Sequence, residues 1–200
     1  MSLNTIIFDF GGVLYNIDYF AATRRLAELS SQPDILSNLP HLKILELPGE
    51  YEKGNISSEE FRDFLRYEYK ISANDDAIDN AWNAMLLGLK AESYDFVESL
   101  KYKYKLALLS NTNEIHHNYF NDECKGVLSL FDYVIFSHNT GMRKPDVEIY
   151  NYTLKTIQSN ASETLFIDDS IVNIDGAKSA GLATIHFSEN LTLSDLLHTI

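Results

Sequence analysis

The chain has 200 residues, of which 45% are apolar and 22% charged, values of an ordinary globular protein with room for one core and a small extra module. Its formal net charge of −13 would repel a phosphate backbone, so nucleic-acid binding is not expected. The single cysteine, Cys124, excludes an internal disulfide and favours a reducing compartment, so we expect a cytoplasmic protein without a membrane partner.

The first predicted strand, Thr5 to Phe8, is short and apolar and ends directly before Asp9. Runs of this kind are typical of buried parallel strands, and ligands bind at the carboxyl ends of such strands. Gly11 and Gly12 would let the chain turn tightly beyond Asp9 with little obstruction. Asp9 is therefore a candidate nucleophile for attack on phosphorus, although an aspartate that only caps a turn is the commoner interpretation of this motif alone.

Residues 16 to 88 show successive helical patterns instead of a second strand. Apolar residues recur at helical spacing over Tyr19 to Leu29 and Phe61 to Tyr69, and we assign a further helix to Trp82, Met85 and Leu86. A crossover between parallel strands needs only one helix. This segment is therefore predicted to be an all-helical cap domain.

The second core strand, Lys105 to Leu109, is followed by Ser110 and Asn111. A hydroxyl and the neighbouring backbone amides can hold phosphoryl oxygens, although Ser-Asn is also ordinary turn chemistry. The third predicted strand, Tyr133 to Phe136, is followed by the stretch GMRKPD.

Lys144 lies within GMRKPD, directly before Pro145. The fixed geometry of proline suits the first turn of a helix, which would hold Lys144 near a helix N-terminus. A lone lysine is more often solvated.

The fourth strand, Thr164 to Ile167, ends at the adjacent pair Asp168 and Asp169. Two neighbouring carboxylates repel each other unless a cation lies close by, and Mg²⁺ prefers such hard oxygen ligands. The alternative role for Asp169 is to cap the helix predicted from Ile171 onward.

With a fifth strand at Ala183 to Phe187, strands and helices alternate through the second half of the chain. We therefore expect a Rossmann-like doubly wound α/β sheet of about five parallel strands with right-handed crossovers. The α/β core would comprise residues 1–15 and 89–200, and the helical cap residues 16–88.

The stretches IIFDFGGVL, LALLSNTN, GMRKPD and LFIDDS together resemble the four motifs of the haloacid dehalogenase-like hydrolase superfamily. The resemblance covers nearly the whole chain and lies in the phosphatase branch with a helical cap. The stretches FDFGGVLYNID, GNISSEEF, LSNTN and GMRKP are most similar to bacterial alpha-D-glucose-1-phosphate phosphatases.

The resemblance implies a Mg²⁺-dependent hydrolase that acts on a small phosphorylated metabolite, such as a sugar 1-phosphate, through an aspartyl phosphate. It implies a nucleophile at Asp9 and phosphate ligands at Ser110, Asn111 and Lys144, with Lys144 also catalytic. Metal ligands are implied at Asp9, at the carbonyl of Gly11 and at Asp168, with Asp169 in a supporting role. The protein would act as a monomer or a homodimer.

One position departs from the family pattern. Most phosphatases of this superfamily carry a second aspartate two residues after the nucleophile, which protonates the leaving oxygen, whereas this chain has Gly11 there. General acid catalysis typically contributes ~10²–10⁴-fold, so its absence matters most for a poor leaving group.

Three interpretations of Gly11 are open. The protein is a phosphatase whose substrate has an acidic leaving oxygen or whose proton comes from elsewhere, a dehalogenase-type enzyme, or a slow-turnover binding or regulatory protein. Asp168 and Asp169 argue against dehalogenation, because that chemistry does not use magnesium.

Four residues are candidate replacement proton donors, and none stands out: Tyr15, Asp18, His116 and His117. Asp18 is placed to cap the helix that begins near Tyr19, and the two histidines are expected on a solvated helix face. Aromatic residues at helical spacing are more often core than sugar contacts, and this applies to Tyr15, Tyr19, Tyr51 and Trp82.

Overall fold

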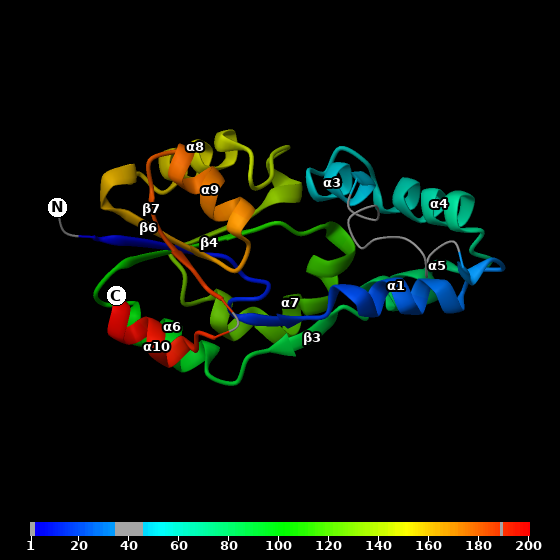
Figure 1. Ribbon diagram of the computed structural model, residues 1–200, viewed down its shortest axis with the longest axis horizontal. Coiled ribbons are helices and arrows are strands. Elements are labelled where there is room, and N and C mark those ends of the chain that lie inside the picture. Colours follow the sequence, from blue (N-terminus) through cyan, green and yellow to red (C-terminus); the bar gives the residue numbers. More distant parts are fainter. Residues whose placement is uncertain (1–2, 35–45, 189) are drawn as a thin grey trace.

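A computed structural model describes residues 3–34, 46–188 and 190–200, without the side chains of residues 46–48. It has two parts, an α/β part that contains both ends of the chain and a helical part at the opposite end of the molecule (Figure 1).

The α/β part is built on a five-stranded parallel sheet, which confirms the predicted doubly wound fold. The strands run in the order β5-β4-β1-β6-β7, so that β1 lies in the centre. Their bounds are β1 Thr5–Phe8, β4 Lys105–Ser110, β5 Tyr133–Phe136, β6 Thr164–Asp168 and β7 Ala183–His186. Ser110 and Asp168 are thus the last residues of strands that flank β1 on either side.

Helices cover both faces of this sheet (Figure 1). Ile6 and Phe8 of β1 point to one face and pack with α6 Ser93–Leu100, α7 Glu114–Leu128 and α10 Leu193–Thr199. Ile7 points to the other face and packs with α8 Val147–Thr156 and α9 Ile171–Ser179. This alternation along one strand explains why the strand is apolar throughout, because both of its faces are buried. Two short 3-10 helices, η2 Ser137–Asn139 and η3 Ala161–Glu163, complete the α/β part.

A two-stranded antiparallel ribbon joins the two parts. It pairs β2 Tyr15–Ile17 with β3 Leu86–Leu89. The sequence analysis predicted neither strand and wrongly placed Leu86 in a helix. These strands have three and four residues and are only partly buried, and each is stabilised by a partner about seventy positions away, so no local pattern marks them.

Between the two ribbon strands lie α1 Tyr19–Glu28, α3 Glu46–Glu52, α4 Ser58–Tyr69 and α5 Asp75–Asn83. They enclose a hydrophobic cluster of their own, with members such as Leu26, Phe61, Leu65 and Trp82, to which α7 adds Ile115. The division into a core and a cap at residues 16 and 88 stays a prediction.

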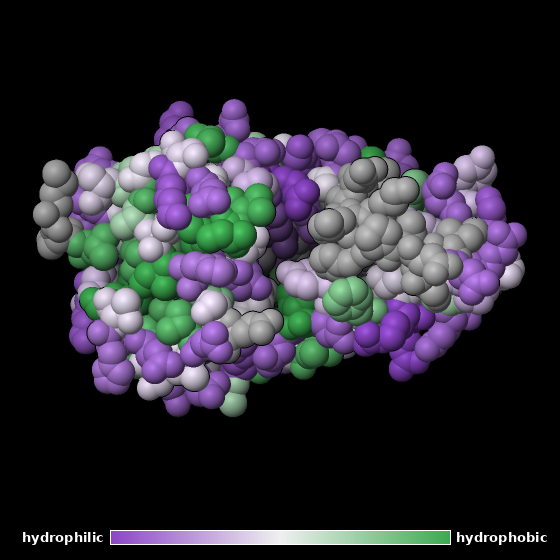
Figure 2. All heavy atoms as spheres, in the orientation of Figure 1, coloured by the Kyte–Doolittle hydropathy of each residue, from purple (hydrophilic) through white to green (hydrophobic). Residues whose placement is uncertain are grey.

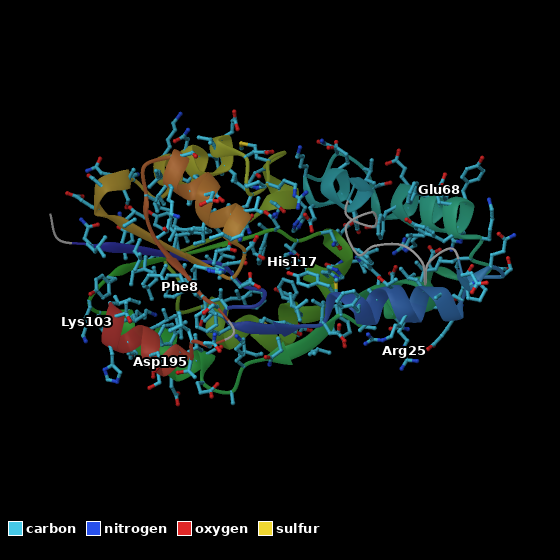
Figure 3. All side chains as sticks on the ribbon, viewed as in Figure 1. Phe8, Arg25, Glu68, Lys103, His117 and Asp195 are labelled. Atoms are coloured by element: carbon cyan, nitrogen blue, oxygen red, sulfur yellow. The ribbon has the colours of Figure 1, made fainter. Side chains whose placement is uncertain are left out.

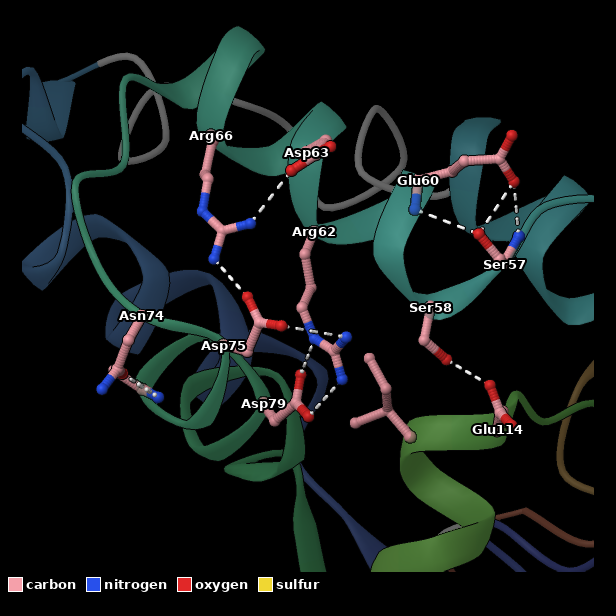
Figure 4. Close-up of polar contacts among 12 residues, drawn as sticks. Ser57, Ser58, Glu60, Arg62, Asp63, Arg66, Asn74, Asp75, Asp79 and Glu114 are labelled. Carbon is pink, nitrogen blue, oxygen red and sulfur yellow. Dashed lines mark hydrogen bonds and ion pairs between the residues drawn. The ribbon is translucent and has the colours of Figure 1, made fainter.

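Polar contacts tie α4 to its neighbours (Figure 4). Arg62 of α4 makes two hydrogen bonds of 2.8 Å to the carboxylate of Asp79 on α5. Ser57 and Glu60 form a capping box at the start of α4. Ser58 donates a hydrogen bond to Glu114 at the start of α7, so α4 also contacts the α/β part.

Hydrophilic residues predominate on the visible face of the helical end, whereas apolar residues show over the α/β part (Figure 2). Within the described ranges, no helix has both the length and the apolar character required to cross a bilayer.

Candidate active site

Three charged side chains meet at the carboxyl ends of the central strands. Asp9 follows β1, Asp168 ends β6, and Lys144 comes from the loop after η2. The Nζ atom of Lys144 lies 2.7 Å from Oδ1 of Asp9 and 2.7 Å from Oδ2 of Asp168. Lys144 is only 1% exposed, so it is a buried cation between two carboxylates and not a solvated lysine.

The loop that carries Lys144 differs from the prediction. Helix α8 begins at Val147 with Asp146 as its N-cap, so Pro145 precedes the helix and does not belong to its first turn. Asp146 makes no side-chain cap hydrogen bond.

Burial and charge act against each other in this cluster. Burial raises the pKa of Asp9 well above its usual value and repulsion by Asp168 raises it further, while Lys144 opposes both effects. Burial disfavours the charged form of Lys144, but attraction by Asp168 and Asp9 outweighs it, so the pKa of Lys144 is raised. The pKa values of Asp9 and Lys144 therefore depend on each other and on the charge of the nearby Asp168.

Asp168 is held by a further set of donors. The backbone N–H of Ser170 donates to Oδ1 (2.8 Å), and Asn173 Nδ2 lies 3.0 and 3.1 Å from the two carboxylate oxygens. The sequence analysis missed Asn173, which is the third residue of α9. Its only signal was a polar amide one helical turn beyond the acidic pair.

Asp169 does not cap α9, because Ser170 is the N-cap. Its carboxylate lies against the backbone of Gly12, where an added Cβ would collide with it. Gly12 also has φ +77°, a conformation that favours glycine. Burial raises the pKa of Asp169, and Asp168 raises it further.

The three carboxylates fit a divalent cation. Asp9, Asp168 and Asp169 each offer one oxygen, and these oxygens lie within 4.8 Å of one another. Hard carboxylate oxygens clustered in this way are the donor set that Mg²⁺ prefers.

Ser110 and Asn111 lie beside this cluster and line the same cavity. Ser110 is buried, and its hydroxyl makes only a long contact of 3.4 Å to the carbonyl of Asn111. The side chain of Asn111 bonds the backbone of Lys144 in both directions, each at 2.9 Å. The Asn111 side chain thus holds the Lys144 loop in place, and the binding of phosphoryl oxygens at Asn111 stays a prediction.

A cavity of about 430 Å³ opens above the cluster. Its lining includes a polar group of residues, which we call the phosphate side: Asp9, Ser110, Asn111, Lys144 and Asp169. It also includes a mainly apolar group, which we call the leaving-group side: Phe10, Tyr15, Ile17, Trp82, Met85, Leu86 and Phe120.

Gly11 also lines the cavity, and the space that a side chain would need there is filled. A Cβ added to Gly11 would collide with Cδ1 of Ile17 from β2. The chain therefore lacks a side-chain acid at this position and places a hydrocarbon group over it.

Two candidate proton donors have other roles. Asp18 caps α1 by accepting from the N–H of Phe20 (3.0 Å), as expected, and pairs with Arg24 at 2.7 Å. The hydroxyl of Tyr15 donates to Glu123 at 3.0 Å, and burial raises the pKa of Tyr15.

The histidines are not on a solvated helix face. His116 is 6% exposed, lies 2.9 Å from Oδ1 of Asn83 through Nδ1, and stacks on Trp82. Burial lowers its pKa to about 3, so it is neutral near pH 7. His117 is half-buried near the junction of the two parts, where it packs on Phe136 (Figure 3). The 3.6-residue periodicity failed here because residues from β5 and from the helical part cover this side of α7.

The aromatic residues lie mostly in the core, as expected: Tyr15, Tyr51 and Trp82 are buried. Tyr19 is 41% exposed at the edge of the cavity.

Glu52 of α3 and Arg143 are a second charged pair on the cavity that the sequence analysis missed. Arg143 lies directly before Lys144, and its guanidinium is 2.9 Å from Glu52. Burial raises the pKa of Glu52, while Arg143 and then Lys144 lower it. A lone glutamate in a segment without a motif carries no signal of this pairing.

These features together define a class of hydrolases built on a Rossmann-like sheet. They are a carboxylate after the central strand, a buried lysine beside it and an adjacent acidic pair. The chain belongs to the haloacid dehalogenase-like hydrolase family, whose model matches residues 3–181.

Similar proteins include a D-ribitol-5-phosphate phosphatase from Bacteroides thetaiotaomicron, 29% identical over 91% of this chain and 90% of the relative. A phosphorylated carbohydrates phosphatase from Thermotoga maritima is 27% identical over 92% of this chain and 84% of the relative. Among solved structures, a HAD family enzyme from B. thetaiotaomicron in complex with magnesium and inorganic phosphate has a TM-score of 0.81. It is 28% identical, and the match covers 98% of this chain and 99% of that enzyme.

Proposed function

We propose that this protein is a Mg²⁺-dependent phosphatase that hydrolyses small phosphomonoesters through an aspartyl phosphate at Asp9. The observation that carries the proposal is the position of Lys144 Nζ, 2.7 Å from both Asp9 and Asp168, beside a third carboxylate. The names of the relatives support it, and the solved relative was crystallised with magnesium and with phosphate, the product of this reaction.

Each residue of the polar side has a defined task in this reaction. Asp9 attacks phosphorus, so that an oxygen–phosphorus bond forms while the bond to the leaving oxygen breaks and that oxygen takes the electron pair. Lys144, fixed by Asn111 and by two carboxylates, and the hydroxyl of Ser110 bind the phosphoryl oxygens. Water then hydrolyses the aspartyl phosphate and regenerates Asp9.

Asp9 and Asp168 would hold Mg²⁺ together with the carbonyl of Gly11 and with Asp169. When bound, the cation neutralises the phosphate and offsets the repulsion among the carboxylates. Asn173 keeps Asp168 oriented, since its amide donates to both oxygens of that carboxylate.

The missing acid at Gly11 limits the substrates. The leaving oxygen must depart as an anion or take its proton from water, which favours substrates with an acidic leaving group. A sugar 1-phosphate meets this condition through its anomeric oxygen. The sequence resemblance implies this class, and the names of two relatives support the broader class of phosphorylated carbohydrates. Cytoplasmic location and a monomer or homodimer are proposed on the sequence alone.

The decisive experiment measures phosphate release from acetyl phosphate and 4-nitrophenyl phosphate, with Mg²⁺ and with a chelator. Both substrates have acidic leaving groups, so we expect turnover that depends on Mg²⁺. Chloride release from 2-chloropropionate instead would favour a dehalogenase. Stoichiometric binding of phosphate without turnover of either ester would favour a binding protein, and each of these results would refute the proposal.

A further inference from the structure

The leaving-group side of the cavity is as strongly apolar as the phosphate side is polar. With the phosphate held by the polar residues, the group esterified to it would contact the leaving-group side. Six of its residues are large and apolar and come from the β1–β2 connection, the ribbon, the segment around α5, and α7: Phe10, Ile17, Trp82, Met85, Leu86 and Phe120.

Aromatic rings form the centre of this side. The ring of Phe10 lies 5.2 Å from that of Tyr15 and 5.2 Å from that of Phe120. Phe10, Tyr15, Trp82 and Phe120 are each at most 3% exposed, so these rings are fixed by packing and lie beneath the lining. The accessible apolar surface above them comes from side chains that are only partly buried, such as Ile17 and Leu86.

Two polar groups beside these residues have partners, since the hydroxyl of Tyr15 donates to Glu123 and His116 is bonded to Asn83. The buried indole Nε1 of Trp82, in contrast, has no hydrogen-bond partner among the described residues. A substrate with several hydroxyls would give up several hydrogen bonds to water, and the one donor of Trp82 could replace no more than one of them. Each polar group left unpaired costs about 1–3 kcal/mol.

Gly11 gives an independent constraint on the same group. The phosphatase chemistry proposed above lacks a side-chain acid there, and Ile17 fills the space. The leaving oxygen must therefore be acidic, while the body attached to it must be apolar. A phenolic oxygen on an aromatic ring has both properties, whereas a sugar 1-phosphate has only the first and an alkyl phosphate only the second.

We infer that the substrate class is an aryl phosphate, whose ring lies against Ile17 and Leu86 and which leaves as a phenoxide. This inference rests on the proposed phosphatase function and replaces the sugar 1-phosphate by an aryl phosphate as the expected substrate. Attack by Asp9 forms the aspartyl phosphate, and the P–O bond to the aryl oxygen breaks with its electron pair on that oxygen. Water then protonates the phenoxide outside the cavity.

Four substrates test the two requirements separately. Phenyl phosphate has an acidic leaving group and an apolar ring, and benzyl phosphate has the ring alone. Glucose 1-phosphate and acetyl phosphate have acidic leaving groups without an aromatic ring. With Mg²⁺ present, we expect kcat/KM for phenyl phosphate to exceed that for glucose 1-phosphate at least ~10-fold, from ring burial. It should exceed that for benzyl phosphate at least ~10²-fold, from the absent acid.

Neighbouring leucines on β3 give a matched pair of variants. Leu86 lines the cavity, whereas Leu87 is 60% exposed and does not line it. Leu86→Ser should lower the ratio of kcat/KM for phenyl phosphate to that for acetyl phosphate about 3- to 10-fold. Leu87→Ser should leave that ratio at the wild-type value.

Binding provides a readout that does not need turnover. Phenylphosphonate should bind more tightly than methylphosphonate to the wild-type protein by calorimetry, and Leu86→Ser should reduce this preference. Equal or better hydrolysis of glucose 1-phosphate would overturn the inference while leaving the phosphatase proposal intact. So would equal effects of the two leucine variants on the ratio. Failure to hydrolyse acetyl phosphate would instead overturn the phosphatase proposal, and the inference with it.

Discussion

The two sides of the cavity are held in place by different forces. On the phosphate side, Asp9, Lys144 and Asp168 fix one another through charge, so a change in any one of them alters the other two. On the leaving-group side, Phe10, Trp82 and their neighbours are held by packing. Under the proposed function, the reaction would depend on a few interdependent groups, whereas the choice of substrate would depend on side chains that can change singly.

The largest expected effect is the loss of turnover when Asp9 is replaced, which should leave the leaving-group side unchanged. Asp9→Asn should reduce turnover of 4-nitrophenyl phosphate by more than about 10⁴-fold, because an amide cannot form the aspartyl phosphate. The fold should persist, since Asn can still accept from Lys144 and from the N–H of Phe10. Steady-state phosphate release and a thermal melt test this. Turnover near the wild-type level would remove Asp9 from the mechanism.

Loss of the shared cation should affect stability as well as rate. Lys144→Met leaves Asp9 and Asp168 buried without compensation, which we expect to cost about 3–5 kcal/mol of unfolding free energy. The pKa of Asp9, already raised by burial, would rise further without Lys144, so the variant should regain stability as the pH falls and Asp9 takes up a proton.

Urea unfolding at pH 7 and pH 5 without metal measures both effects. Lys178→Met is the matched control, because Lys178 has an exposed side chain and pairs only with Asp175, three residues away; its cost should stay within ~0.5 kcal/mol. Equal costs for the two variants would show that the charges on this side are not interdependent.

An acid introduced at position 11 should separate the need for a proton from the preference for an apolar ring. Gly11→Asp should raise kcat/KM for benzyl phosphate about 10- to 100-fold and change phenyl phosphate much less, because only the poor leaving group needs a proton. The side chain of Ile17 must rotate aside to make room. Gly11→Asn has the same size without the proton and is the control. A gain with Asn equal to that with Asp would attribute the effect to shape.

The smallest expected effect is on the pH dependence of stability, and it comes from His116 beside the leaving-group side. His116 has a folded pKa of about 3 against an unfolded value of about 6.5, so the unfolded chain binds more protons between these pH values. Its contribution to stability is complete above pH ~6.5 and is lost as the pH falls, by about 2 kcal/mol between pH 6.5 and pH 5. Denaturant unfolding of His116→Gln should lack this part of the slope. His198→Gln, at an exposed position on α10, should retain it.

The sequence predicted the sheet correctly because each strand is a short apolar run. It also predicted that Asp9, Ser110 and Asp168, which follow or end such runs, would meet Lys144 at one edge, because parallel strands bring their carboxyl ends together. The roles assigned to these residues stay predictions. Gly11 was visible as a departure from the family pattern. That Ile17 occupies its space was not, because β2 has no pattern of its own.

The leaving-group side could not be predicted, because its residues are brought together by long-range pairing that leaves no local pattern in the sequence. Leu86 belongs to a strand that exists only by pairing with β2, and the burial of His116 depends on Asn83 and Trp82, more than thirty positions away. That the amide of Asn111 holds the Lys144 loop could not be predicted either, because the two residues are 33 positions apart.

The contacts made by the first turn of α7 affect how freely the helical part can move. The N–H of Ile115 donates to the hydroxyl of Tyr51, and His116 stacks on Trp82, so this turn packs as much with the helical part as with the sheet. Lifting the helical part away would break these contacts and wet the Trp82 ring. Any movement of the helical part relative to the sheet would therefore have to break these contacts first.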